Sequence, residues 1–257
     1  MGIRKETISI NLDTLVKQVP RAALNTILPP HSLISGLPIN DEDSELWQAV
    51  KFLDNPCCDA CGFPFEFDAG NDILCIRCQV ARPRYDKARA AISYEEASRK
   101  IILDFKHGGR TDGLEFFSAQ MQRAGCSFIA KSDFIVPVPL HKARLRARKF
   151  NQSALLARAL SKRANLPYET SLLLRLKNTA SQSGKSFVGR KRNVQGAFRL
   201  AVKKSAKLKG ANVLLIDDVF TTGATLEACA HTLRRGGAAK IYALTLMRVV
   251  RPVSIAK

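Results

Sequence analysis

Two neighbouring carboxylates stand where a buried strand would meet a helix. The apolar run 213–216 predicts a strand, and Asp217 and Asp218 follow it directly. The next residues are small or carry hydroxyl groups, and they open a predicted helix: Thr221, Thr222, Gly223, Ala224 and Thr225. Backbone N–H groups at a helix N-terminus bind phosphate, and a glycine lets the backbone approach it. Paired acids can accept hydrogen bonds from ribose hydroxyls, so the pattern predicts a ribose-phosphate site.

Four cysteines have the spacing of a metal site. Cys58 and Cys61 form one Cys-x2-Cys pair, and after thirteen further residues Cys75 and Cys78 form a second. Each pair can present two thiolates to one tetrahedral ion, and four thiolates complete the shell of a structural Zn²⁺. No coordination position is left for water, so we expect the zinc to hold the fold rather than to catalyse. Two alternatives stay open: Cys57 in place of Cys58, and a set of free buried cysteines.

Positive charge is concentrated in one part of the chain. The sequence has 41 Lys and Arg against 22 Asp and Glu, a formal net charge of +19. Residues 140–210 hold 19 of the basic residues and one acid, Glu169. Clustering of this kind favours an anionic partner. The density of positive charge in this segment also exceeds what the binding of one diphosphate needs. We therefore predict that this face binds single-stranded DNA with little sequence preference. A solvated basic surface without a partner is the simpler alternative.

The composition is that of an ordinary globular protein. Of the 257 residues, 46% are hydrophobic and 25% are charged, which excludes a fibrous or disordered chain. No apolar run reaches the roughly 18 residues of a membrane span, and residues 1–6 lead into no apolar signal segment. We therefore expect a cytoplasmic protein without membrane insertion. In that compartment clustered cysteines bind metal more often than they form disulfides.

Alternating strands and helices must position these residues. From residue 85 onward, apolar runs predict strands at 88–94, 133–136, 172–176, 213–216 and 241–247. Helical patterns are found between them, at 95–106, 112–124, 151–164 and 225–235. The alternation predicts an α/β fold, with a parallel sheet flanked by helices.

The chain divides into two predicted regions, 1–84 and 85–257, with the α/β domain in the second. Within the first region, residues 30–38 match the start of the cysteine segment 56–78 at an offset of 26 residues. Both prolines and the glycine coincide, but serines stand in place of two cysteines. The first region is therefore interpreted as a double zinc-ribbon-like segment whose first copy lacks its ligands. With so short a match, coincidence is an equally good explanation.

Several motifs resemble those of one protein family. The segment from Asp217 to Thr225 is similar to the signature with which type I phosphoribosyltransferases bind 5-phosphoribosyl-1-pyrophosphate (PRPP). The loop alone would also suit an ordinary helix cap. Further stretches, however, resemble the ComF/GntX family of competence-associated, phosphoribosyltransferase-like proteins: the cysteine segment and residues 94–108, 136–152 and 175–198. Two positions depart from the family pattern, because Lys149 replaces a usual glycine and Lys185 a usual apolar residue.

The resemblance implies a type I phosphoribosyltransferase-like parallel sheet flanked by helices, with a small N-terminal zinc ribbon. It implies a pyrophosphate loop whose candidate donors are Lys142, Arg144 and Arg148. It also implies a flexible loop over residues 177–195, with Gln182 and Arg190 as candidate contacts. Mg²⁺ would accompany PRPP, because a diphosphate needs a divalent cation.

Two functions are compatible with this resemblance. In the first, the protein assists DNA uptake in natural competence. It holds PRPP or a nucleotide in the type I site, binds incoming single-stranded DNA and works beside a competence helicase. In the second, it is an active PRPP-dependent phosphoribosyltransferase of nucleotide metabolism. The resemblance favours the first function, but it names no catalytic residue and no acceptor, and fold analogy alone does not decide between the two.

Overall fold

A sheet of four parallel strands forms the centre of the molecule. The structure, a computed structural model, describes residues 47–68, 70–107, 113–177 and 196–250. The strands pair in the order β1-β6-β5-β2: β1 (Lys87–Ser93), β6 (Lys240–Arg248), β5 (Asn212–Phe220) and β2 (Phe134–Pro137). A separate antiparallel pair joins β3 (Leu173–Arg175) to β4 (Phe198–Leu200).

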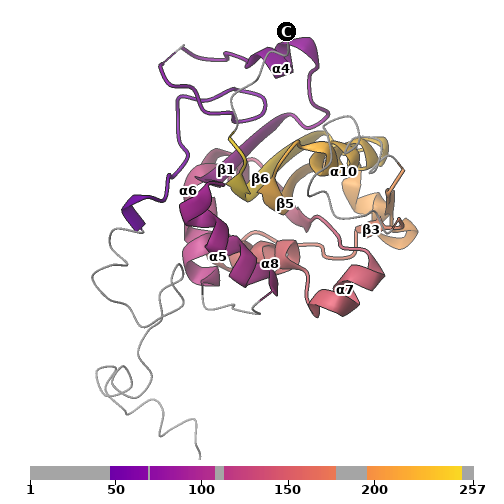
Figure 1. Cartoon of the computed structure of the whole chain (residues 1–257). Helices are drawn as coiled ribbons and strands as arrows, with labels where there is room; N and C mark the ends of the chain where they lie inside the picture. Colours follow the sequence, from indigo (N-terminus) through magenta and orange to yellow (C-terminus); the bar gives the residue numbers. More distant parts are fainter. Residues whose placement is uncertain (1–46, 69, 108–112, 178–195, 251–257) are drawn as a thin grey trace, which may run out of the picture.

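Helices cover both faces of the sheet (Figure 1). One face carries α5 (Glu96–His107), α6 (Leu114–Ile129) and α8 (Gln152–Ala164), and the other carries α10 (Ala224–Arg235). The described structure also contains three shorter helical segments: α4 (Ile76–Val80), α7 (Lys142–Arg148) and the 3-10 helix η1 (Val202–Leu208). No helix in these ranges is long and apolar enough to cross a membrane.

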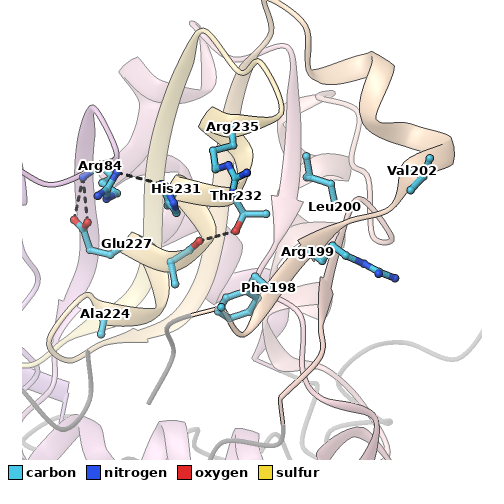
Figure 2. Close-up of a pocket in the computed structure, with 12 residues that line it drawn as sticks. Arg84, Phe198, Arg199, Leu200, Val202, Ala224, Glu227, His231, Thr232 and Arg235 are labelled. Carbon is cyan, nitrogen blue, oxygen red and sulfur yellow. Dashed lines mark hydrogen bonds between the residues drawn. The ribbon is translucent and has the colours of Figure 1, made fainter. Parts of the chain in front are cut away.

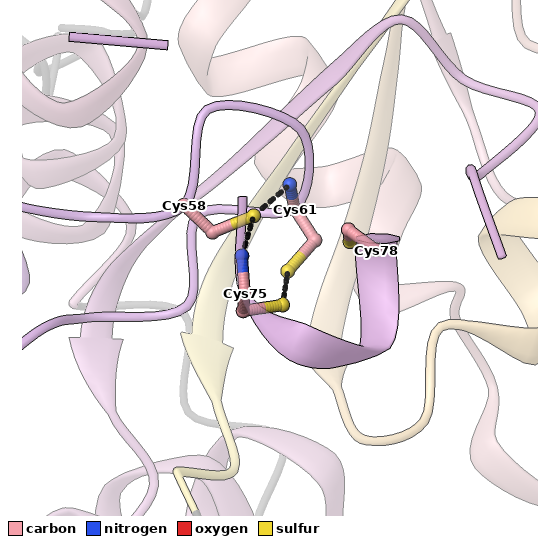
Figure 3. A group of neighbouring side chains, drawn as sticks. All are labelled: Cys58, Cys61, Cys75 and Cys78. Carbon is pink, nitrogen blue, oxygen red and sulfur yellow. Dashed lines mark hydrogen bonds between the residues drawn. The ribbon is translucent and has the colours of Figure 1, made fainter. Parts of the chain in front are cut away.

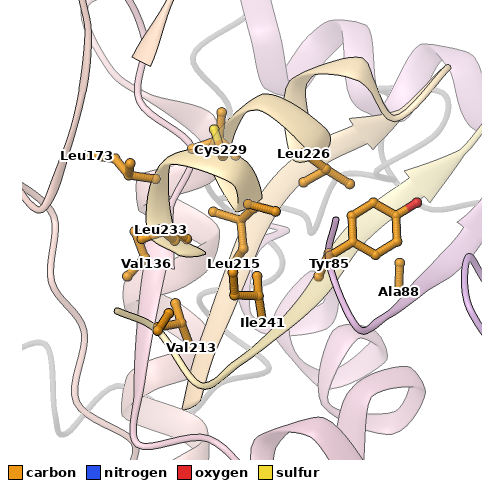
Figure 4. Packing of buried hydrophobic residues seen from close by; sticks show 14 of the residues in the cluster. Tyr85, Ala88, Val136, Leu173, Val213, Leu215, Leu226, Cys229, Leu233 and Ile241 are labelled. Atoms are coloured by element: carbon orange, nitrogen blue, oxygen red, sulfur yellow. The ribbon is translucent and has the colours of Figure 1, made fainter. Parts of the chain in front are cut away.

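Alternate residues of β5 fill two separate cores. Leu214 and Ile216 are fully buried among residues of α5, α6 and α8. Val213 and Leu215 point to the other face, where they pack with α10 (Figure 4). Successive side chains of a strand point to opposite faces, so an unbroken apolar run is what a strand buried on both faces requires.

The cysteine segment packs directly on the sheet. Cys58, Cys61 and Cys78 are buried in the same core as α10. The backbone N–H of Ala88 in β1 donates to the carbonyl of Ala60 at 2.8 Å. Residues 51–53 run antiparallel along the free edge of β1, with a bridge between Phe52 and Ile92. The cysteine segment (residues 56–78, called the ribbon below) and the sheet therefore share one hydrophobic core.

The predicted fold class is confirmed, and the predicted strands and helices after residue 85 are all present. One helix is longer than predicted, since α6 continues to Ile129 across Gly125, which has non-helical angles (φ −112°, ψ 15°). A Cβ at Gly125 would lie 2.5 Å from a side-chain atom of Leu244, so the glycine lets α6 approach β6 closely. The repeat at 30–38 and most of the predicted flexible loop lie outside the described residues.

Candidate functional site

The two acids are residues of β5 itself and do not lie beyond its end. The sequence predicted a strand over 213–216, but β5 continues to Phe220 because β6 pairs with it as far as Arg248. Asp217 and Asp218 are half-buried there. The chain then turns through residues 221–223 and enters α10 at Ala224. A loop that opens a helix follows the strand, as the sequence predicted, but the two acids belong to the strand instead of following it.

Gly223 fits the tight entry into α10. Its φ is 77°, in the left-handed region that favours glycine. A Cβ at this position would lie 2.8 Å from Cζ of Phe220. The backbone N–H of Ala224 donates a long hydrogen bond to Oγ1 of Thr222, at 3.4 Å. The loop is thus held close to the end of β5 by its own backbone.

Replacing Gly223 with alanine is expected to lower the free energy of unfolding by about 2–3 kcal/mol. The left-handed conformation costs a non-glycine residue about 1–2 kcal/mol, and the clash with Phe220 adds to this cost. Urea unfolding measures the change. Gly210→Ala is a matched control, because its φ is 76° and a Cβ there meets nothing within 4 Å. Equal losses for the two variants would contradict the close packing of the loop.

Hydrogen bonds orient the two carboxylates. Ser153 at the start of α8 donates its hydroxyl to Oδ1 of Asp217 at 2.9 Å, and the N–H of Asp218 donates to the same oxygen at 3.0 Å. The N–H of Val219 donates to Oδ1 of Asp218 at 2.7 Å. Asn151 caps α8 and also donates to the carbonyl of Val138 at 3.0 Å, which fixes α8 beside the end of β2.

Three arginines lie close enough for their charges to interact, and one of them, Arg175, also interacts with Asp217. The segment predicted as a pyrophosphate loop contains the helix α7, and residues four apart on a helix share a side. Arg144 and Arg148 are half-buried on one side, whereas Lys142 and Arg146 are exposed on the other. Burial, followed by the neighbouring charges of Arg175 and Arg148, lowers the pKa of the Arg144 guanidinium. Clustered cations of this kind gain stability when an anion binds among them.

Arg175 at the end of β3 is a site residue to which the sequence analysis gave no role. Its guanidinium lies 5.3 Å from the ring centroid of Phe198. Burial lowers the pKa of Arg175, and the negative charge of the Asp217 carboxylate opposes that shift. An arginine that closes an apolar strand just before a basic loop is the one signal that could have singled it out.

The four predicted cysteines form one cluster (Figure 3). Their sulfur atoms all lie within 4.8 Å of one another, and the sulfurs of Cys61 and Cys75 are 3.7 Å apart. A tetrahedron with Zn–S bonds of about 2.3 Å has S–S edges of about 3.8 Å, so the cluster fits a structural Zn²⁺. Cys57 is not part of it, because its thiol donates to the side chain of Asn55.

Donors surround the sulfur cluster, as they do in thiolate metal sites. The backbone N–H groups of Cys61 and Cys75 donate to the sulfur of Cys58 at 3.5 and 3.3 Å. Arg248, at the end of β6, donates to the carbonyl of Cys61 at 2.5 Å and to its sulfur at 3.5 Å. The guanidinium of Arg248 also lies 4.2 Å from the ring centroid of Phe220. Arg248 therefore links the cysteine cluster to the strand that carries the two acids.

The ribbon also contacts the predicted PRPP loop. Arg77, in α4, donates a hydrogen bond to the carbonyl of Thr222. The backbone N–H of Arg84 donates to both carboxylate oxygens of Glu227 in α10, at 3.1 and 3.2 Å. The structure thus brings the cysteine segment next to the strand that carries the two acids and next to the loop that opens α10. Gln182 and Arg190, the predicted flexible-loop contacts, lie outside the described residues.

Several known proteins are similar in sequence to most of this chain. The family model described as "Phosphoribosyl transferase domain" matches residues 151–252. Competence protein F of Haemophilus influenzae is 31% identical over 198 residues, which cover 75% of this chain and 85% of that protein. The DNA utilization protein YhgH of Escherichia coli is 29% identical and covers 77% of this chain and 86% of its own. The competence protein ComFC of Bacillus subtilis is 29% identical, with coverage of 77% and 80%. The chain belongs to the competence protein F (ComF) family of phosphoribosyltransferase-like proteins.

Proposed function

We propose that this protein binds PRPP with Mg²⁺ in the site between β5, α7 and α10 and binds single-stranded DNA on its basic face. It would act in the cytoplasm, in the handling of incoming DNA, as the names of its relatives as competence and DNA utilization proteins suggest. The cysteine cluster would hold a structural Zn²⁺. A helicase of the DNA-uptake machinery is the expected protein partner.

One observation carries the proposal for PRPP. Asp217 and Asp218 lie in the last part of β5, and the loop that follows this strand opens α10. The charge of Arg175 interacts with that of Asp217, and Arg175 also interacts with Arg144 of α7. In this arrangement the acids would accept hydrogen bonds from the ribose hydroxyls, and the N–H groups at the start of α10 would bind the 5-phosphate. Arg144, Arg148 and Arg175 would bind the diphosphate, whose charge Mg²⁺ would further neutralise.

Calorimetric titration of PRPP into the zinc-loaded protein tests this assignment. We expect one PRPP to bind per chain, and we expect binding to weaken when Mg²⁺ is removed. Ribose 5-phosphate should bind more weakly, because it lacks the diphosphate that the arginines would contact. Absence of PRPP binding at millimolar concentration in the presence of Mg²⁺ would refute the proposal.

DNA binding is expected to depend on the exposed side of α7. Lys142→Glu with Arg146→Glu should weaken binding to all oligonucleotides alike, because backbone contacts carry no sequence information. For two lost phosphate contacts, the slope of log affinity against log salt should flatten by about 1.4. Fluorescence anisotropy with labelled single strands measures both effects.

Arg99→Glu with Lys131→Glu is the matched control, since it reverses two exposed charges outside residues 140–210. If the control variant loses as much affinity as the α7 variant, binding reflects the net charge of the protein rather than this helix. If the wild type does not bind at about 50 mM salt, where phosphate contacts are strong, the DNA proposal fails.

An active phosphoribosyltransferase is the second candidate function. The loop, the acids and the arginines that would bind PRPP are all present, and this observation favours the second function as much as the first. Incubation with PRPP, Mg²⁺ and a panel of bases and amines distinguishes the two. Release of pyrophosphate with one acceptor would establish the enzyme.

A further inference from the structure

A groove lies on the outer face of α10, between that helix and β4 (Figure 2). Its volume is about 640 Å³, within the range of ligand-binding sites. Phe198 and Leu200 of β4 form one apolar wall, and Ala224 and Ala228 of α10 form the other. Val202 stands at the rim with 84% of its surface exposed. Ala224 also belongs to the loop proposed to bind the 5-phosphate of PRPP, whereas Leu200 and Ala228 have no role in the proposed PRPP chemistry.

Cations line the rim of this apolar groove. Arg199, from β4, and Arg235, from the end of α10, are both exposed. In the part of the chain that the structure describes, neither guanidinium takes part in a hydrogen bond or an ion pair. Arg84 lies at the opposite end of the groove, where its guanidinium is 3.1 Å from Nδ1 of His231. Among the described residues of the lining, Glu227 is the one acid, and its carboxylate accepts a hydrogen bond from the backbone N–H of Arg84.

The groove and the PRPP site share a wall. The ring of Phe198 is buried and forms part of the groove lining. The guanidinium of Arg175 lies over the same ring, 5.3 Å from its centroid, and its charge interacts with that of Asp217. Arg175 in turn interacts with Arg144 of α7, so the basic side of the protein continues from α7 to the groove. The two sites are therefore neighbours that do not overlap at Arg199 or Arg235.

We propose that this groove is the base-binding part of the DNA surface: bases of a single strand enter it while Arg84, Arg199 and Arg235 contact the adjoining phosphates. This rests on the proposed binding of single-stranded DNA. A single strand offers an apolar base beside each phosphate, which matches an apolar floor with cations at both ends. In a duplex the bases are paired and stacked and cannot enter, so the groove selects single strands.

The first test compares two double variants by anisotropy with a labelled oligo(dT). Arg199→Ala with Arg235→Ala should weaken binding by about tenfold or more, since each lost hydrogen bond involves a charged group. The salt slope should flatten by about 1.4. Arg99→Ala with Lys131→Ala removes the same charge elsewhere and should change affinity less than twofold. Affinity for PRPP should stay unchanged in both variants.

A second variant tests whether DNA binds in the groove itself or is only attracted by the positive charge around it. Ala228→Trp fills the groove and leaves every charge in place, so it should weaken oligo(dT) binding while the salt slope stays the same. Circular dichroism confirms that the variant is folded. If it is unfolded, Ala228→Leu makes the same comparison with a smaller side chain.

The outcomes are distinguishable. If the wild type binds oligo(dT) and the arginine variant binds equally well, the groove assignment is wrong and the proposed function stands. If the wild type does not bind, the proposed function itself fails. Competition by thymidine monophosphate as strong as competition by the oligonucleotide, per nucleotide, would make the groove a mononucleotide site instead. Equal competition by poly-glutamate would point to an acidic protein and overturn the assignment.

Discussion

Cys58→Ser is expected to unfold the whole described structure, and not only the segment that carries the cysteines. Cys58 is fully buried in a core that also contains residues of β5 and α10. Structural zinc contributes about 10–16 kcal/mol in small zinc-binding peptides, whereas the total stability of a domain is about 5–15 kcal/mol. Zinc analysis and circular dichroism should therefore show loss of metal and loss of cooperative unfolding together, and a strong chelator should have the same effect on the wild type.

Cys57→Ser is the matched control for this prediction. Cys57 adjoins Cys58 in the chain, but its thiol lies outside the cluster of four. The control should keep about one zinc per chain and unfold as the wild type does. A Cys58→Ser variant that loses its metal but unfolds at the wild-type temperature would show that the ribbon and the sheet are energetically independent.

Asp217→Asn with Asp218→Ala is expected to weaken PRPP binding by at least about 100-fold. Hydrogen bonds to charged groups contribute about 1.5–3 kcal/mol each, and the substitution removes two charged acceptors. The fold should persist, because both side chains are only half-buried. Calorimetry measures the affinity, and urea unfolding checks the stability. Glu96→Gln is the control, since it removes an acid from the first turn of α5. Wild-type affinity in the double variant would exclude these acids from the site.

The local sequence pattern was sufficient to predict the strands of the parallel sheet, the two cysteine pairs and the Asp-Asp-loop segment. The strands of the sheet are apolar runs, and a run such as 213–216 is recognisable because the strand is buried on both faces. The cysteine pairs and the Asp-Asp-loop sequence are contiguous, so their spacing alone groups them.

Features that depend on distant contacts were not predictable in the same way. α7 has no buried residue, and its one large apolar side chain, Leu145, is 41% exposed, so no apolar period marks it as a helix. For this reason the sequence could not separate Lys142, on the exposed side, from Arg144. The docking of the ribbon through Arg248 joins residues 187 positions apart, and no local pattern encodes such a contact.

A co-crystal structure of the wild-type protein with PRPP and Mg²⁺ tests the central claim most directly. We expect the 5-phosphate to accept hydrogen bonds from backbone N–H groups of residues 222–225. The ribose hydroxyls should lie on Asp217 and Asp218, and the diphosphate should lie against Arg144, Arg148 and Arg175. PRPP bound away from this loop, or a loop left empty at concentrations that saturate the protein in solution, would contradict the account.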